Sequence, residues 1–409
     1  MPTTFVRQLF SPRMLVAFLM GFACGVPLLL TGSVLQAWMT EEGVDLTVIG
    51  LYSLVGLPYT LKFLWAPVFD RFTLPLCGRR SGWMLVTQVC LIVGLIGLGL
   101  TDPARSPWVV AGVAFLVTFL SASQDIVIDA YRREDLRDNE LGLGSSLYVN
   151  GYRLGMLLAG SGGLILADHF SFAQVYLMMA ATLLVGVVTT LSCREPALTR
   201  GTPRTFREAV VEPFTDYFRR DHALALLLFI LLYKLGDQMA STMTTPFYLD
   251  LGFTKTQIGA VAKLFGFWSA IAGGLLGGAI LMRIGIVRSL WAFGILQGAA
   301  ILSFTALALA GNTVVGLAVA IALEQFTSGM GTAAYVAYMA SLTNRRFTAT
   351  QYALLSSCMG VPRVIIAAPA GWLADLLGWP LFFVGCTLIA LPGLALLPLV
   401  GRQYRRDVQ

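Results

Sequence analysis

Apolar runs of membrane-spanning length dominate the chain, and short polar stretches separate them. A bilayer core of roughly 30 Å is crossed by about 20 helical residues. Twelve runs reach or approach that length, at roughly 14–39, 47–69, 82–101, 108–131, 143–167, 172–192, 222–248, 256–282, 287–310, 313–341, 350–376 and 380–400. The pattern predicts an all-α membrane protein with twelve transmembrane helices and little chain left for a soluble domain.

Composition and charge support this class and set an orientation. Hydrophobic residues make up 57% of the chain and charged residues 12%, whereas soluble domains carry about a quarter charged residues. Of the 28 lysines and arginines, 21 lie on the side of the predicted helices that includes both termini, and only Arg105 and Lys255 lie opposite. Basic loops stay in the cytoplasm, so both termini are expected there. The net charge of +6 therefore reflects topology, not nucleic-acid binding.

An internal repeat relates the two halves of the chain. GVDLTVIG at 43–50 matches GFTKTQIG at 252–259, and each stretch follows an odd-numbered helix and opens the next. GLILAD at 163–168 likewise resembles GWLAD at 371–375, in helices that each carry one arginine near the middle. Because both halves begin on the inner side, the repeat is expected to be parallel, with two pseudo-symmetric bundles of six helices.

The longest polar stretch, residues 193–221, lies between the two halves. Phe206, Val210, Phe214 and Phe218 recur every four residues, which predicts an amphipathic helix on the inner membrane surface, shortened by Pro213. We therefore expect an N-terminal bundle at 1–192, a cytoplasmic linker at 193–221 and a C-terminal bundle at 222–409.

Two sets of motifs resemble known families. PVFDRFTLPLCGRR at 67–80 is similar to a stretched form of the G-x-x-x-D-R-x-G-R-R signature of the major facilitator superfamily, with a proline in place of the first glycine. The equivalent stretch of the second half, GGAILMRIGIVR at 277–288, keeps the basic residues and lacks the aspartate. This resemblance implies the major facilitator fold, with Asp70 and Arg71 in the inner gate.

A closer resemblance is to the AmpG muropeptide permeases. It rests on VPLLLTGSVLQAWM (26–39), SLVGLPYTLKFLWAPVFDRF (53–72), SASQDIVIDAY (121–131), GYRLGML (151–157), LLYKLGD (231–237) and ATQYALLSS (349–357). Many relatives carry two further helices, and Pro362 stands where relatives usually have glycine. The resemblance implies import of anhydro-muropeptides, the disaccharide GlcNAc-anhydro-MurNAc with or without its stem peptide, across the bacterial inner membrane.

Nine ionisable side chains interrupt the apolar runs. An ionised group at a helix centre costs roughly 2.5–3.5 kcal/mol on insertion scales, so these groups are expected to pair or to line one aqueous cavity. They are Lys62, Asp125, Asp129, Arg153, Lys234, Asp237, Lys263, Glu324 and Arg363. With no P-loop present, a proton gradient is the expected energy source.

The acids are the candidates for proton coupling and gating. Asp125 and Asp129 are four residues apart, so one helix face carries both. If the basic loop begins at Arg132, Asp129 lies within about one turn of the cytoplasmic surface. By resemblance, Asp129 would then pair with Arg71 as a gate lock, and the deeper Asp125 would couple protons. Glu324 and Asp237 are the alternative coupling acids.

Basic and aromatic side chains are the candidates for substrate binding. Arg153 and Arg363 are expected near the midplane, where an arginine fork can hold a stem-peptide carboxylate or pair with buried acids. Lys234 shares a helix face with Asp237, so the two can form a self-contained ion pair, or one of them can interact with the substrate. The remaining candidates, for which core packing or snorkelling is the alternative, are Lys62, Lys263, Gln124, Tyr59, Tyr152, Trp268 and Tyr335.

Two other functions compete with muropeptide import. An exporter of drugs or of other amphiphilic or zwitterionic molecules would share the fold. A membrane enzyme needs a base or nucleophile constellation, but the two histidines, His169 and His222, are predicted at helix ends on opposite sides. We expect no catalytic residues, metal or cofactor. The expected partners are the substrate, protons and lipid, with no nucleic acid, and the protein is expected to be a monomer.

Overall fold

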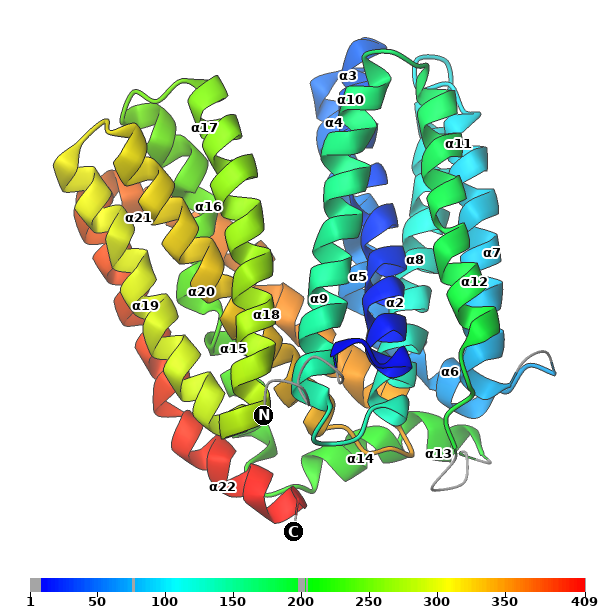
Figure 1. Cartoon of the computed structure of the whole chain (residues 1–409). Coiled ribbons are helices and arrows are strands. Elements are labelled where there is room, and N and C mark those ends of the chain that lie inside the picture. The colour runs from blue at the N-terminus through cyan, green and yellow to red at the C-terminus, as the bar shows by residue number, and fades with distance from the viewer. Residues whose placement is uncertain (1–8, 76–77, 198–202, 204, 409) are drawn as a thin grey trace. The chain divides into compact units, whose positions relative to one another are not determined.

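The computed structural model of the chain is helical throughout the residues that it describes, which are 9–75, 78–197, 203 and 205–408 (Figure 1). This confirms the predicted all-α class. Within these ranges, nine helical segments are long and apolar enough to cross a membrane. They are Pro12–Glu41, Arg79–Gly99, Pro107–Asp135, Phe172–Ser192, Ala223–Asp250, Phe267–Ile284, Ile286–Ala310, Val314–Ser341 and Pro369–Arg402.

Four predicted spans differ from this simple pattern. Residues 46–71 form short pieces, namely α4 (Leu46–Leu51), α5 (Leu57–Leu61) and α6 (Ala66–Arg71), with 3-10 turns between them at Tyr52–Gly56 and Lys62–Leu64. Prolines at the starts of α5 and α6 account for the interruptions, because proline lacks the N–H that a helix interior needs. Residues 141–167 contain a π-helical turn, and α21 (Thr348–Ala395) joins the last two predicted spans through a kink at Gly378.

The other helices have regular bounds. They are α2 (Pro12–Leu30), α3 (Ser33–Glu41), α7 (Arg79–Gly99), α8 (Pro107–Asp135), α9 (Leu141–Leu157), α10 (Gly163–Ala167), α11 (Phe172–Thr182), α12 (Leu184–Ser192), α13 (Phe206–Val210), α14 (Glu212–Phe218), α15 (Ala223–Leu232), α16 (Leu235–Asp250), α17 (Lys255–Val261), α18 (Phe267–Ile284), α19 (Ile286–Ala310), α20 (Val314–Ser341) and α22 (Leu397–Val408). The linker thus contains two short helices, α13 and α14, where one amphipathic helix was expected.

The chain forms two compact units. Unit 1 comprises Met1–Asp138, Leu147–Phe214 and Thr343–Ser357, and unit 2 comprises Asn139–Ser146, Thr215–Leu342 and Cys358–Gln409. Each unit therefore includes a short segment from the other half of the sequence. We call Thr343–Ser357, which includes the first turns of α21, the docking segment, because all its contacts described below are with unit 1.

Unit 1 is held together by close backbone packing and an aromatic core. Helix α2 packs against α8 and α12, and glycines let it approach α9 closely. A Cβ added at Gly151 would lie 2.0 Å from the carbonyl oxygen of Phe18, and one added at Gly25 would lie 2.1 Å from that of Tyr152. Trp38 stacks on Phe172 with 5.3 Å between ring centroids. Glycines four residues apart provide such contacts in membranes, where no hydrophobic force draws helices together.

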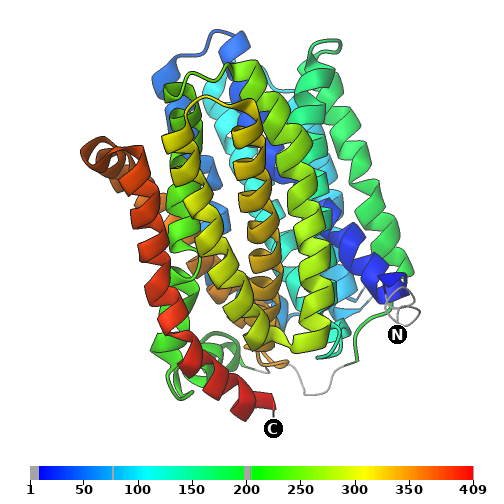
Figure 2. The same ribbon diagram turned by 60° about the vertical axis from the view of Figure 1, so that its left-hand side comes forward.

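Close packing at glycines also occurs in unit 2, around α20. Helices α18 and α19 both pack against α20, as their neighbouring ribbons in Figure 2 show. A Cβ at Gly273 would lie 2.0 Å from the carbonyl oxygen of Phe326, so the lack of a side chain at this position permits the close approach. In the same unit, the Ser146 hydroxyl donates to the Gly274 carbonyl. Phe247 and Phe383, with ring centroids 4.8 Å apart, belong to the aromatic core.

The internal repeat extends to turn geometry. The amide of Gly43 donates to Thr40 and that of Val44 to Met39, and Gly252 and Phe253 donate in the same way to Leu249 and Tyr248. Both glycines have positive φ, 71° and 85°. This pair of bonds is the Schellman arrangement that ends a helix on a left-handed residue, for which glycine carries no steric penalty. The matched sequences therefore fold into matched turns.

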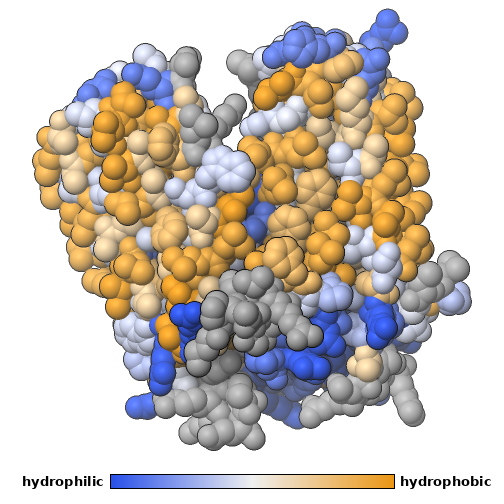
Figure 3. Space-filling model, viewed as in Figure 1, coloured by the Kyte–Doolittle hydropathy of each residue, from blue (hydrophilic) through white to orange (hydrophobic). Residues whose placement is uncertain are grey.

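On the face shown in Figure 3, a broad apolar surface covers the middle of the helices. Hydrophilic side chains gather at the helix ends, and exposed apolar side chains include Leu100, Val188 and Leu309. Contiguous apolar surface of this extent is unusual for a soluble protein. It matches the predicted contact with lipid.

The backbone contact between α2 and α9 generates a stability prediction. Gly151→Ala places a methyl group against the Phe18 carbonyl and should lower stability by about 1–3 kcal/mol, seen as a lower melting temperature in detergent. Gly97→Ala in α7 is the matched control, since a Cβ there meets nothing within 4 Å. Equal shifts for the two variants would contradict this account of the packing.

Candidate functional site

A buried polar cluster in unit 1 contains most of the predicted N-terminal site residues. Asp125 and Gln124 lie on α8, and both are buried. The Gln124 amide contacts the Cys24 thiol at 3.7 Å, and Cys24 also hydrogen-bonds Asp125. Lys62, buried in the 3-10 turn after α5, acts electrostatically on Asp125 and Asp129. It therefore does not snorkel to the surface, and it compensates two carboxylates at once.

Two tyrosines border this cluster. The Tyr59 hydroxyl donates to Ser121 Oγ at 2.8 Å, on the face of α8 that also carries Asp125. Tyr152 interacts electrostatically with Asp125 and with Tyr59. The structure thus brings together Asp125, Asp129, Lys62, Gln124, Tyr59 and Tyr152 as one polar group. Arg153 follows Tyr152 in α9 and is partly buried.

The predicted pairing of Asp129 with Arg71 was wrong. Asp129 Oδ1 accepts from Arg132 Nη2 at 3.0 Å, whereas the Arg71 guanidinium lies over the Phe72 ring. Helix α8 continues to Asp135, so Arg132 belongs to the helix and is 3% exposed instead of opening a loop. Asp129 consequently lies deeper than the sequence suggested. The Arg132 guanidinium also lies over the Tyr148 ring, 4.5 Å from its centroid, and donates to the Tyr352 hydroxyl at 2.9 Å.

Asp70 joins the docking segment to a buried charge network. Its carboxylate pairs with Arg80 at 2.8 Å, and Arg80 also pairs with Glu134 at 2.6 Å. The same carboxylate accepts from the amide and the hydroxyl of Thr350, at 2.9 and 2.8 Å, and from the amide of Ala349. A carboxylate that accepts amide bonds in the first turn of a helix is favoured by the orphan N–H groups and the helix dipole.

The end of α12 connects to this network. Glu195 accepts from the amides of Arg80 and Ser81, the second and third residues of α7, and from the Ser81 hydroxyl. The neighbouring Cys193 is partly buried, and burial raises the pKa of its thiol above the ordinary value. Glu195 therefore caps α7 and attaches the start of the linker to unit 1.

Further polar contacts hold the docking segment to unit 1. Arg345 pairs with Asp138 at 3.5 Å, and Arg346 pairs with Glu208 of α13 at 3.1 Å. These pairs are partly exposed and contribute little individually. The Asp70 and Arg132 contacts are buried and are therefore the stronger candidates for a gate.

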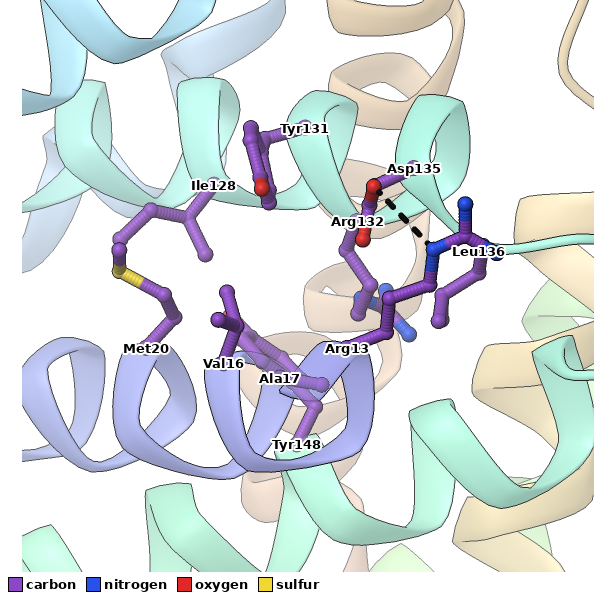
Figure 4. A pocket seen from close by; sticks show the side chains of 10 residues that line it. All are labelled: Arg13, Val16, Ala17, Met20, Ile128, Tyr131, Arg132, Asp135, Leu136 and Tyr148. Carbon is purple, nitrogen blue, oxygen red and sulfur yellow. Dashed lines mark ion pairs between the residues drawn. The ribbon is translucent and has the colours of Figure 1, made fainter. Parts of the chain in front are cut away.

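A narrow pocket lies beside Arg132 (Figure 4). Its empty volume is about 230 Å³, part of it open to solvent, and α2, α8 and α9 line it. Arg13 and Asp135 form an ion pair of 3.6 Å, and the floor includes Met20, Ile128 and Tyr148. The pocket is too small for a disaccharide. It offers a place for water near the buried guanidinium.

Unit 2 contains a second buried charge cluster. Lys234 pairs with Asp237 at 3.3 Å, as the three-residue spacing predicted. Lys234 Nζ also donates to Gln297 Oε1 at 3.2 Å, and the Ser328 hydroxyl donates to Asp237 at 3.4 Å. Lys234 lies between α15 and α16, where the helix is interrupted. The pair is therefore supported by α19 and α20, and its charges are largely compensated inside the unit.

The remaining candidates of the C-terminal half occupy varied places. Glu324 on α20 is buried and acts electrostatically on Tyr248. Tyr335 is fully buried, stacks on Tyr233 and donates to the Ile230 carbonyl. These contacts are those of core packing, which was the alternative to substrate binding. Trp268 is 61% exposed. Lys263 lies in a π-helical turn and Arg363 in α21, and both side chains lie outside the described residues.

Several partners were not predicted from the sequence. Arg80, Glu134, Arg132, Thr350 and Tyr352 form the buried contacts at Asp70 and Asp129. Glu134 and Arg132 belong to the charged end of α8, which the hydropathy pattern had assigned to a loop. Thr350 and Tyr352 lie within ATQYALLSS, where the polar residues before an apolar run were the available signal. In the part of the chain that the structure describes, no group of histidines, cysteines or acids could hold a metal ion.

Comparisons with known proteins agree with this arrangement. The family model of the Major Facilitator Superfamily matches residues 13–323. The anhydromuropeptide permease of Escherichia coli strain K12 is 42% identical over 98% of this chain and 82% of its own length. A protein named putative transporter AmpG 4 from Rickettsia conorii is 32% identical over 94% of this chain and 95% of its own.

A solved structure supports the fold. The fucose:proton symporter FucP of Escherichia coli matches with a TM-score of 0.76 and 12% identity, covering 96% of this chain and 99% of that one. At such low identity the match shows the fold alone. The fold, the family model and the permease relatives together establish that this chain belongs to the major facilitator superfamily of transporters and, within it, to the anhydromuropeptide permease family.

Proposed function

We propose that the protein imports anhydro-muropeptides across the bacterial inner membrane in symport with protons. The observation that carries this proposal is the 42% identity, over 98% of the chain, to a relative named anhydromuropeptide permease. The substrate is the disaccharide GlcNAc-anhydro-MurNAc with or without its stem peptide. The proposal includes twelve transmembrane helices in two pseudo-symmetric bundles, joined by the linker 193–221, with both termini in the cytoplasm and a monomer as the working unit.

Substrate binding is assigned to the basic and aromatic residues of both halves. Arg153 and Arg363 would hold stem-peptide carboxylates, because a guanidinium fork fits a carboxylate with two parallel bonds. The polar cluster around Tyr59, Tyr152 and Gln124 offers ring faces and amide groups to a sugar. Lys263 and Trp268 are the corresponding candidates of the second half.

Proton coupling is assigned to Asp125. It is buried on α8, its Oδ1 atom has no hydrogen-bond partner, and Lys62 compensates it only electrostatically. Asp129, in contrast, is held by a direct ion pair with Arg132. A buried carboxylate without a direct ion pair gains more from taking up a proton than one with such a pair. Asp237 and Glu324 remain the alternative coupling acids.

Uptake by right-side-out membrane vesicles tests the function. Vesicles that contain the protein should accumulate labelled anhydro-muropeptide, and a protonophore should abolish the accumulation because it removes the proton gradient. Vesicles without the protein are the control. Absence of uptake with and without the protonophore would contradict the proposed substrate, and uptake confined to inside-out vesicles would indicate an exporter.

The two aspartates of α8 should differ in their effects. Asp125→Asn should abolish concentrative uptake while sparing exchange of substrate between the two sides, because exchange needs no net proton movement. Asp129→Asn should leave some proton-driven uptake, since it loses the ion pair with Arg132 and not the proposed coupling acid. Normal accumulation and protonophore sensitivity in Asp125→Asn would exclude Asp125 and favour Glu324 or Asp237.

Asp70 should control access and not binding. Asp70→Asn keeps the shape of the side chain but weakens the charge-assisted bonds to Arg80 and the start of α21, which are about twice as strong as neutral ones. We expect a shift in the labelling of introduced cysteines on the two membrane sides, with substrate affinity retained. Labelling identical to that of the parent protein would show that Asp70 does not take part in gating.

A further inference from the structure

One nitrogen atom joins the charge of Asp129 to the docking segment. Arg132 Nη2 donates both to Asp129 Oδ1, at 3.0 Å, and to the Tyr352 hydroxyl, at 2.9 Å. An arginine terminal nitrogen carries two N–H groups in the fixed plane of the guanidinium. When one N–H points to the carboxylate, the direction of the other is therefore determined.

The surroundings leave the guanidinium few other orientations. It lies over the Tyr148 ring, 4.5 Å from the centroid, and 5.5 Å from the centroid of Tyr352. Arg132, Asp129, Tyr148 and Tyr352 are all buried. Rotation of the guanidinium in this space would require the two rings to move, so the carboxylate and the rings together fix its direction.

From this geometry we infer that Arg132 and Tyr352 are positioning residues for transport: the charge of Asp129 directs Arg132 toward Tyr352 and so holds the docking segment against α8. The inference rests on the proposed proton coupling. When Asp129 takes up a proton, its bond to Arg132 loses the negative charge of the acceptor and keeps only the charge of the guanidinium, so the bond becomes weaker. Arg132 is then free to turn, Tyr352 loses a directed donor, and the first turns of α21 separate more readily from α8.

Several groups besides Arg132 influence the protonation of Asp129. On α8 the nearest charge is Asp125, and the 3-10 turn after α5 contributes Lys62. Cys24 of α2, Tyr148 and Tyr152 of α9, and Tyr352 of α21 also interact with Asp129. Because Asp125 and Asp129 repel one another while both are ionised, a proton taken up at one of them lowers the tendency of the other to take up a second proton. The test therefore has to separate these two acids.

The experiment measures how far the docking segment is protected from a thiol reagent. Ser357→Cys is a suitable probe, because Ser357 belongs to this segment, is buried, and has a hydroxyl without a hydrogen-bond partner. It is introduced into the full chain on a background without native cysteines. The labelling rate is divided by that of the denatured protein at the same pH, which removes the effect of thiol ionisation.

We expect the relative labelling rate to rise about tenfold from alkaline to mildly acidic pH, the change expected for weakening one charge-assisted bond. Asp129→Asn should label rapidly at both pH values. Tyr352→Phe removes only the hydroxyl and should also lose the pH dependence, with the rate already high at alkaline pH.

Three controls separate this mechanism from general loosening. Tyr148→Phe keeps a ring beneath Arg132 and removes only a hydroxyl that makes no bond to α21. The pH dependence should therefore remain. Asp125→Asn should retain it as well if Asp129 is the controlling acid. Asp70→Asn removes a separate contact of the docking segment, so it should raise the rate at both pH values and leave their ratio unchanged.

An unaltered pH dependence in Tyr352→Phe, or none in the parent, would overturn the inference. The assay needs no muropeptide, so its outcome is independent of the substrate assignment. If labelling behaves as expected while vesicles take up no muropeptide, the proposed substrate fails and the inference stands. If uptake occurs but Tyr352→Phe labels as the parent does, the inference fails and the proposed substrate stands.

Discussion

A charge inside a bilayer-spanning helix must be compensated locally, and this constraint shapes both units. Outside water, an unpaired ion costs several kcal/mol, and a paired ion is tolerated only where its remaining hydrogen-bond capacity is met. Unit 1 meets the requirement with Arg80, placed between Asp70 and Glu134, and with Arg132 beside Asp129. Unit 2 meets it with Lys234, which contacts Asp237 and Gln297. The two units thus compensate their buried charges with different residues.

The two units differ in how their charges connect to other parts of the chain. In unit 1 the Asp70 carboxylate accepts bonds from backbone amides and a hydroxyl of the docking segment, so this carboxylate takes part in the attachment of a helix. In unit 2 the Lys234 pair, among the residues with described side chains, hydrogen-bonds side chains and a carbonyl of its own unit. This asymmetry agrees with the sequence, where the second half keeps the basic residues of the loop signature and lacks its aspartate.

Local patterns predicted local structure well. Hydropathy predicted the helical class, and the three-residue spacing of Lys234 and Asp237 indicated the ion pair as one of two alternatives. The matched glycine motifs indicated a repeat, and the structure shows that they form matched turns. The end of α8 was mispredicted, because a run of charged residues was interpreted as solvated loop. Arg132 and Glu134 are helical and buried because their partners come from distant parts of the chain, Tyr352 and Arg80. A single sequence does not contain such pairings, so the ion-pair partner of Asp129 could not be predicted.

Stiffness is distributed unevenly along the helices. Where Gly25 and Gly151 bring backbones into contact, α2 and α9 can move only as one piece, because close-packed interfaces deform little. Helices with 3-10 or π-helical turns bend more easily, since their regular hydrogen-bond ladder is broken. Three lysines of the spans predicted from the sequence lie at such points: Lys62 in a 3-10 turn, Lys234 between α15 and α16, and Lys263 in a π-helical turn. These lysines therefore lie where the helices bend most easily. An electrostatic force on one of them acts at a point where the chain resists bending least.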